Sequence, residues 1–92
     1  SGVKAKAGKG RKITVSWKKN SKAEGYKVYR STKKSKGFKA VATAKSGKTV
    51  KVTVKSGQKK GKTYYFKVRG YKKIAGKTCY SKYSKVVKVK AK

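Results

Sequence analysis

Short segments in which apolar and polar residues alternate constrain the fold of this chain more than any other feature. In the segment Lys12–Trp17, the apolar residues Ile13, Val15 and Trp17 occupy every second position. Successive side chains of a strand point to opposite faces, so a period of two predicts strands with one face in a core rather than helices. The same pattern predicts strands over Gly25–Ser31, Phe38–Ala44, Val50–Val54, Tyr64–Tyr71 and Val86–Lys90, with a short leading strand over Val3–Ala7.

Turn signals separate the predicted strands. Most contain glycine, which adopts the positive φ values that tight turns require. They are Lys19–Ser21, Lys36-Gly37, Ser46–Lys48, Ser56-Gly57, Lys60-Gly61 and Ala75–Lys77. About seven short strands with turns every 8–12 residues or so are typical of an antiparallel sandwich. We therefore expect an all-β, two-sheet antiparallel sandwich of about seven strands, without a helix, formed by residues 1–92 as one domain. The opening Ser1-Gly2 resembles the remnant of a cleavage site.

The charge of the chain is its most unusual property. Lysine and arginine number 31 against one acidic residue, which gives a formal net charge of +30. Low hydrophobicity with high net charge is typical of disordered chains, but the alternating Val, Ile and Tyr residues argue for a folded one. Solubility requires a net charge of only about 2–8 on a small domain, so the positive field itself is a candidate for function.

The density of this charge predicts a stability that depends on salt. A folded chain of 10.1 kDa is expected to expose ~5,300 Å² of surface, or one net charge per ~175 Å². The Debye length at physiological salt is ~8 Å, so neighbouring charges are screened but not independent. We expect the isolated domain to lose stability as salt is removed.

The residue inventory excludes most enzymatic chemistry. General acid–base catalysis needs a group that titrates near neutrality or a pair of carboxylates, and metal sites need clustered His, Cys or carboxylate ligands. The sequence has no His, one Cys and one acidic residue. We therefore expect no enzyme, no cofactor, no metal site and no small-molecule substrate. We also expect no membrane-spanning stretch, because none is apolar enough, and no signal peptide.

Two single residues allow alternative interpretations. Cys79 follows a predicted turn and is expected to be a small, partly buried apolar residue; the alternative is a surface thiol that oxidises to a dimer. A lone cysteine cannot form an intrachain disulfide. Glu24 is expected to be a surface carboxylate of little energetic consequence. Its alternative is a proton shuttle for an isopeptide bond between a lysine and Asn20.

Three stretches carry a resemblance to a known family. They are Trp17 at the end of a strand, Gly25–Ser31, and Gly61–Tyr71. On these residues the chain resembles a fibronectin type III domain over nearly its whole length. Its ending, Tyr80–Val87, is similar to the last-strand region of such domains in large surface proteins of Gram-positive gut bacteria.

The resemblance implies roles for individual residues. Trp17 would lie between the two sheets, and Tyr64 would be the corner tyrosine whose hydroxyl binds the preceding loop. Phe66 and Val68 would face the core, and Gly70 would allow the sheets to pack closely. The chain departs from the family at Gln58, where a core leucine is usual, so the resemblance leaves the packing of that loop open.

The resemblance also implies which residues share the outer face of one sheet. In a fibronectin-like sandwich, Gly25–Ser31, Tyr64–Tyr71 and the last strand lie side by side. Lysines neutralise phosphates or sulfates, and tyrosine rings offer planes on which bases or sugars stack. The alternative for the tyrosines is that cross-strand pairs of rings stabilise the sheet. The predicted polyanion-binding residues are Lys27, Tyr29, Tyr65, Lys67, Arg69, Tyr71, Lys88 and Lys90.

These observations favour a non-enzymatic, highly basic module of a bacterial surface or secreted protein, either extracellular or attached to the cell wall. It would bind polyanions without sequence specificity, such as teichoic acid, the backbone of extracellular DNA or other nucleic acid, and sulfated glycans. An anionic membrane surface is a further candidate partner. Lysine far outnumbers arginine, the residue better suited to specific bidentate contacts. The isolated domain is expected to be monomeric and to serve as an adhesive or stalk unit.

Two other origins remain open from the sequence. The absence of Asp, Leu, Pro, His and Met is compatible with an engineered, supercharged scaffold on the same fold. The charge is also compatible with a dedicated protein that binds nucleic acid non-specifically.

Overall fold

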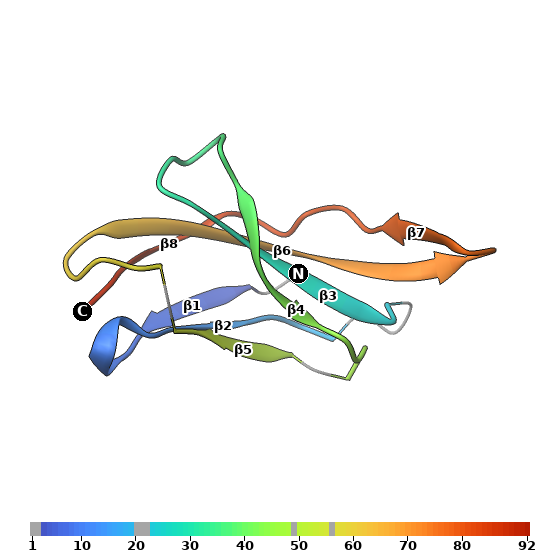
Figure 1. Cartoon of the computed structure of the whole chain (residues 1–92), viewed down its shortest axis with the longest axis horizontal. Helices are drawn as coiled ribbons and strands as arrows, with labels where there is room; N and C mark the ends of the chain where they lie inside the picture. Colours follow the sequence, from blue (N-terminus) through green and yellow to red (C-terminus); the bar gives the residue numbers. More distant parts are fainter. Residues whose placement is uncertain (1–2, 20–22, 49, 56) are drawn as a thin grey trace.

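The computed structural model describes residues 3–19, 23–48, 50–55 and 57–92. Two antiparallel sheets pack face to face, which confirms the predicted all-β sandwich (Figure 1). The smaller sheet has the order β1 (Lys4–Ala7), β2 (Ile13–Ser16) and β5 (Lys51–Val54). The larger sheet contains β4 (Lys39–Ala44), β3 (Gly25–Ser31), β6 (Thr63–Ile74), β7 (Lys77–Tyr80) and β8 (Val87–Lys90).

The long strand β6 organises the larger sheet. One edge of β6 pairs with β3 along the whole of that strand. The other edge pairs with β8 along its first part and with β7 along its last part. Figure 1 shows β8 and β7 lying in succession along β6, joined by a segment without regular structure. The predicted side-by-side arrangement of the third, long and last strands is therefore confirmed.

Two elements were not predicted from the sequence. The short 3-10 helix η1 (Lys9–Arg11) lies between β1 and β2. Strand β7 follows the predicted turn, where Ala75 and Gly76 have φ values of 52° and 81°. Positive φ at both central residues is typical of two-residue hairpin turns. All four residues of β7 are exposed, so this strand has no alternating apolar pattern by which it could be recognised.

Some sequence predictions fall on residues outside the described ranges. They are the possible cleavage remnant at Ser1-Gly2, the turn residues Asn20, Ser21 and Ser56, and the isopeptide bond that would use Asn20. Glu24 is exposed, as expected, and its Oε2 accepts a hydrogen bond of 2.7 Å from the backbone N–H of Lys73.

The core is formed by the inward residues of both sheets. Ile13 and Val15 of the smaller sheet and Val28 and Phe66 of the larger sheet are fully buried. Trp17 is buried among them, and its ring centroid lies 5.3 Å from that of Tyr26. The predicted place of the tryptophan between the sheets is confirmed.

The tyrosine corner is also present. Tyr64 is buried, and its hydroxyl accepts a hydrogen bond of 2.6 Å from the backbone N–H of Lys59 in the preceding loop. Gly70 has little room for a side chain, because a Cβ there would lie 2.9 Å from the Cβ of Ala23. The tyrosine corner that the resemblance implied is confirmed. The close contact of Gly70 is with the connection between β2 and β3, so its role in close packing of the two sheets stays a prediction.

The loop before β6 packs around a buried amide. Gln58 is buried, and its Nε2 donates hydrogen bonds to the carbonyl oxygens of Arg11 (2.8 Å) and Val54 (2.9 Å). Its Oε1 accepts a hydrogen bond from the guanidinium of Arg30. A buried amide is costly unless it is hydrogen-bonded, and these contacts compensate the cost. This polar network replaces the apolar packing of a leucine.

The exposed surface is larger than its mass predicts. It amounts to 6356 Å², against the expected ~5,300 Å². The molecule is elongated, with extents of 43 × 24 × 21 Å, and an elongated body exposes more surface than a compact one of the same mass. The surface per net charge is roughly 210 Å² (6356 Å² divided by 30), so the charges are less dense than predicted. Within the described ranges, no helix is long and apolar enough to cross a lipid bilayer.

Candidate polyanion-binding surface

The residues predicted to bind polyanions lie on one face of the larger sheet. In the strand registers, Lys27 of β3 is opposite Arg69, and Tyr29 is opposite Lys67. On the other edge of β6, Lys88 is opposite Tyr65, and Lys90 is opposite Thr63. Directly opposite residues of paired strands point to the same side, so these side chains share the outer face. The face is not uniform, however, and divides into three parts.

The first part is a stack in which cations alternate with aromatic rings. The Cζ atom of Arg69 lies 3.8 Å from the ring centroid of Tyr80 and 4.5 Å from that of Tyr83. The Nζ atom of Lys67 lies 3.7 Å from the ring centroid of Tyr83 and 4.3 Å from that of Phe38. We call these five residues the cation–aromatic ladder. Each such contact contributes about 0.5–1 kcal/mol at an exposed site, so the ladder stabilises this part of the sheet.

Tyr29 and Lys27 of the neighbouring strand β3 also contact the ladder. The Tyr29 ring meets the Tyr83 ring edge to face, with centroids 5.3 Å apart, and its hydroxyl accepts a hydrogen bond of 3.1 Å from Nε of Arg69. Nζ of Lys27 donates to the Tyr80 hydroxyl at 3.4 Å. Tyr29 is buried under these neighbours, with 9% of its surface exposed. The prediction that Tyr29 offers an open stacking plane is therefore wrong, because Tyr83 covers it.

The segment between β7 and β8 presents the rings of the ladder. Together with Tyr80, the last residue of β7, it contains a doubled tripeptide, Tyr80-Ser81-Lys82 followed by Tyr83-Ser84-Lys85. A period of three on an extended chain places both tyrosines on one side and both serines on another. A period of two does not indicate this arrangement, so Tyr80 and Tyr83 were not among the predicted site residues.

The two serines attach this segment to β6 by hydrogen bonds in pairs. The backbone N–H of Ser81 donates to Gly70 O (2.9 Å), and Ser81 Oγ accepts from Gly70 N (2.8 Å). Ser84 makes the same pair with Val68, at 2.7 and 2.9 Å. The serine hydroxyls thus accept hydrogen bonds from backbone N–H groups of β6, at the part of its edge where no regular strand pairs with it. These contacts fix the positions of both tyrosines.

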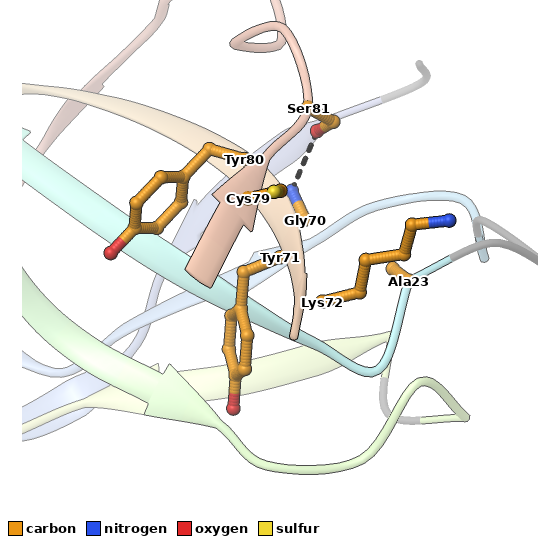
Figure 2. A pocket seen from close by; sticks show the side chains of 7 residues that line it. All are labelled: Ala23, Gly70, Tyr71, Lys72, Cys79, Tyr80 and Ser81. Carbon is orange, nitrogen blue, oxygen red and sulfur yellow. Dashed lines mark hydrogen bonds between the residues drawn. The ribbon is translucent and has the colours of Figure 1, made fainter. Parts of the chain in front are cut away.

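The second part of the face surrounds Tyr71. Its ring lies over Gly25, where an added Cβ would be 2.5 Å from the Tyr71 hydroxyl. Tyr71 and Tyr80 also line a pocket of about 190 Å³, and Figure 2 shows Cys79 and Lys72 around it. Cys79 is exposed, which corrects the expectation of a partly buried residue. Among the described residues that line this pocket, Lys72 is the one cation, so they offer little charge to a polyanion.

The third part is an open groove beside Tyr65. Lys34, Tyr65, Val86 and Lys88 line a cavity of about 440 Å³, which we call the Tyr65 groove. Tyr65 is half-buried, whereas Lys34 and Lys88 are exposed. Lys90, two residues after Lys88 on the same face, is exposed as well. Sequence reasoning missed Lys34, because it lies in the connection between β3 and β4, where no alternation indicates a direction.

Comparison with solved structures identifies the fold. A Fn3-like protein from Clostridium thermocellum superposes with a TM-score of 0.81 over 99% of this chain and 88% of that chain. This chain has a fibronectin type III-like fold. The two sequences are 23% identical, so the likeness concerns the fold alone. No protein-family model matches the sequence. No curated protein matches it at a significant level.

Proposed function

We propose that this fibronectin type III-like domain is a non-enzymatic module that binds polyanions, with the Tyr65 groove as the preferred place of contact. The observation that carries the proposal is the combination of exposed Lys34 and Lys88 with a half-exposed ring on a domain of net charge +30. A cationic groove that follows a backbone, with an aromatic plane beside it, is the usual arrangement for binding single strands without sequence preference.

The proposed mechanism is release of counterions from the polyanion. Lysines that neutralise phosphates or sulfates free the condensed ions of the polymer, so affinity falls steeply as salt rises. Only three of the 31 basic residues are arginines: Arg11, Arg30 and Arg69. Arg69 already lies against tyrosine rings, so few guanidinium groups are available for specific bidentate contacts. The selectivity proposed is therefore for charge density.

This chemistry suits teichoic acid, the backbone of extracellular DNA and sulfated glycans equally. A module of this kind would act as an adhesive or stalk unit of a secreted or surface-attached bacterial protein. The ladder would stabilise the sheet beside the groove, so that Tyr65 on β6 keeps its position before binding. Preorganisation of this kind reduces the entropy cost of association.

The test is a salt titration of binding by fluorescence anisotropy. Labelled double-stranded DNA, heparin and a poly-glycerol-phosphate chain are the probes. We expect all three to bind, with log–log salt slopes that follow only their charge densities. The double variant Lys34→Gln/Lys88→Gln should bind each probe more weakly than Lys4→Gln/Lys51→Gln, which removes the same charge from the smaller sheet. Absence of binding to all three probes at about 0.15 M salt would contradict the proposal.

A further inference from the structure

A second concave cationic surface lies away from the Tyr65 groove. It is a pocket of about 240 Å³ at the ends of β3, β4 and β6, which we call the Arg30 pocket. Four basic residues line it, together with Thr32 and, on its apolar wall, Val41 and Tyr64. The basic residues are Arg30, Lys39, Lys59 and Lys62.

Gln58, Tyr64 and Gly57 are among the neighbours of the Arg30 guanidinium. Its Nη1 donates to Oε1 of Gln58, and its Cζ lies 5.7 Å from the ring centroid of Tyr64. At Gly57, where φ is 82°, an added Cβ would lie 2.6 Å from Nη2 of Arg30. A residue with a side chain at this position would displace the guanidinium, so glycine provides its space.

The buried Gln58 is the anchor of this arrangement. Its Nε2 is fixed by the carbonyl oxygens of Arg11 and Val54, so its Oε1 can only point toward Arg30. A leucine at this position would fill the same space but could not accept a hydrogen bond. The polar residue therefore positions a cation at the wall of the pocket, which an apolar residue cannot do.

No acidic side chain balances the positive charge of the residues that line this pocket. Four cations around one small volume repel one another; water and salt screen this repulsion in part, and an anion among the cations would relieve it further. The sequence contains a single acidic side chain, Glu24, which binds the backbone of Lys73 and does not line this pocket. An anion that balances these cations directly would therefore come from outside the protein.

We propose that the Arg30 pocket binds one tetrahedral oxyanion group, a phosphate or a sulfate of the polyanion. The inference deepens the proposed function and rests on it: the Tyr65 groove contacts the polymer through its charge density, whereas this pocket takes a single group. Lys39, Lys59, Lys62 and the Thr32 hydroxyl would donate hydrogen bonds to its oxygens, and Arg30 would supply a fixed positive charge. Charge-assisted hydrogen bonds of this kind are about twice as strong as neutral ones.

The experiment uses inorganic phosphate and sulfate as probes. Each potassium salt is titrated into the ¹⁵N-labelled domain at constant ionic strength, and amide chemical shifts are recorded. We expect saturable shifts at Thr32, Gly37, Gly57, Lys59 and Lys62. The two arms distinguish the sources, because tighter binding of phosphate indicates a phosphate polymer and tighter binding of sulfate indicates a sulfated glycan. Either result supports the pocket.

Two variants and a matched control make the test specific. Gln58→Leu leaves the net charge unchanged and removes the anchor of Arg30. Lys59→Gln/Lys62→Gln replaces two cationic donors by neutral, shorter amides and keeps the backbone hydrogen bonds of both residues. We expect each to weaken anion binding about tenfold, the usual effect of losing one or two hydrogen bonds to a charged group. Lys4→Gln/Lys51→Gln, with the same loss of charge, should bind as the parent does. If Gln58→Leu does not fold, which its amide spectrum reveals, the lysine pair carries the test alone.

Shifts spread evenly over the lysines, or equal losses in the pocket variants and the control, would overturn the inference. Its failure is distinguishable from failure of the proposed function. If heparin and DNA bind but phosphate and sulfate find no localised site, the pocket is refuted and the general binding stands. If the anions bind in the pocket but no polyanion binds, the proposed function fails.

Discussion

The ladder and the Tyr65 groove lie on the same face of the same sheet, yet their cations have different surroundings. In the ladder, Lys67 and Arg69 are half-buried and each lies against at least two rings. In the groove, Lys34 and Lys88 are exposed beside one ring. Lysine occurs in both parts, so the different surroundings of Lys67 and Lys88 come from the neighbouring segments. A basic residue on this face that lies against several rings stabilises the fold, whereas one that lies beside a single ring is open to a ligand.

The largest effect is expected from removing the centre of the ladder. Arg69→Ala should lower the free energy of unfolding by about 2 kcal/mol, because it deletes contacts with several rings and the hydrogen bond to Tyr29. Urea denaturation measures this change. Lys51→Ala on the smaller sheet is the control and should change stability by less than about 0.5 kcal/mol. Equal effects of the two substitutions would refute the division of the face.

The next effect concerns the ring of the groove. Tyr65→Ala should weaken binding of single-stranded DNA about tenfold, because one stacking plane is lost. Heparin binding should change less, since heparin has no bases and would be held mainly through its sulfates. Fluorescence anisotropy with both probes measures the difference. A loss of the same size for heparin would show that the tyrosine only supports the shape of the groove.

A smaller effect is expected where the ladder is attached to β6. Ser84→Ala leaves the N–H of Val68 without its hydroxyl acceptor, so stability should fall by about 1 kcal/mol. The exposed Ser35 provides the control, and Ser35→Ala should leave the urea midpoint unchanged. If Ser84→Ala also leaves the midpoint unchanged, the paired serine hydrogen bonds do not hold this segment.

The smallest expected effect is the dependence of the melting temperature on salt, which comes from the charges of the whole surface. The melting temperature should rise by a few degrees between about 20 and 200 mM salt, since screening relieves repulsion among charges and about 1 kcal/mol shifts it by roughly 4–8 °C. Differential scanning calorimetry in sodium chloride measures it. A melting temperature independent of ionic strength would mean that the spacing of charges already makes their repulsion negligible.

Local patterns predicted much of the fold, because a period of two is visible in the sequence. Gly25–Ser31 was predicted with the bounds of β3, and Tyr64, Phe66 and Val68 were placed correctly in the core. Strand β7 was not predicted, because all four of its residues are exposed and its sequence therefore shows no alternation of apolar and polar residues. Its pairing with β6 defines it as a strand.

The candidate sites were less predictable, because they depend on contacts between distant segments. The position of Tyr83 over Lys67 requires the chain between β7 and β8 to follow β6 at a fixed register. Likewise, Gln58 meets Arg30 across 28 residues of sequence, and only the folded loop brings them together. Alternation indicated the correct face, but it could not indicate which cations on that face would be covered by rings.

The most direct test of the account compares two single substitutions that remove the same charge from the same face. Lys67→Gln in the ladder and Lys88→Gln in the groove are each measured by urea denaturation and by heparin binding, with Lys51→Gln as the reference. The account predicts that Lys67→Gln lowers stability by about 1 kcal/mol and binds heparin as the reference does. It predicts the reverse for Lys88→Gln, with unchanged stability and weaker binding than the reference. If both variants retain stability and lose the same affinity, the face is a uniform layer of charge and the division into ladder and groove is wrong.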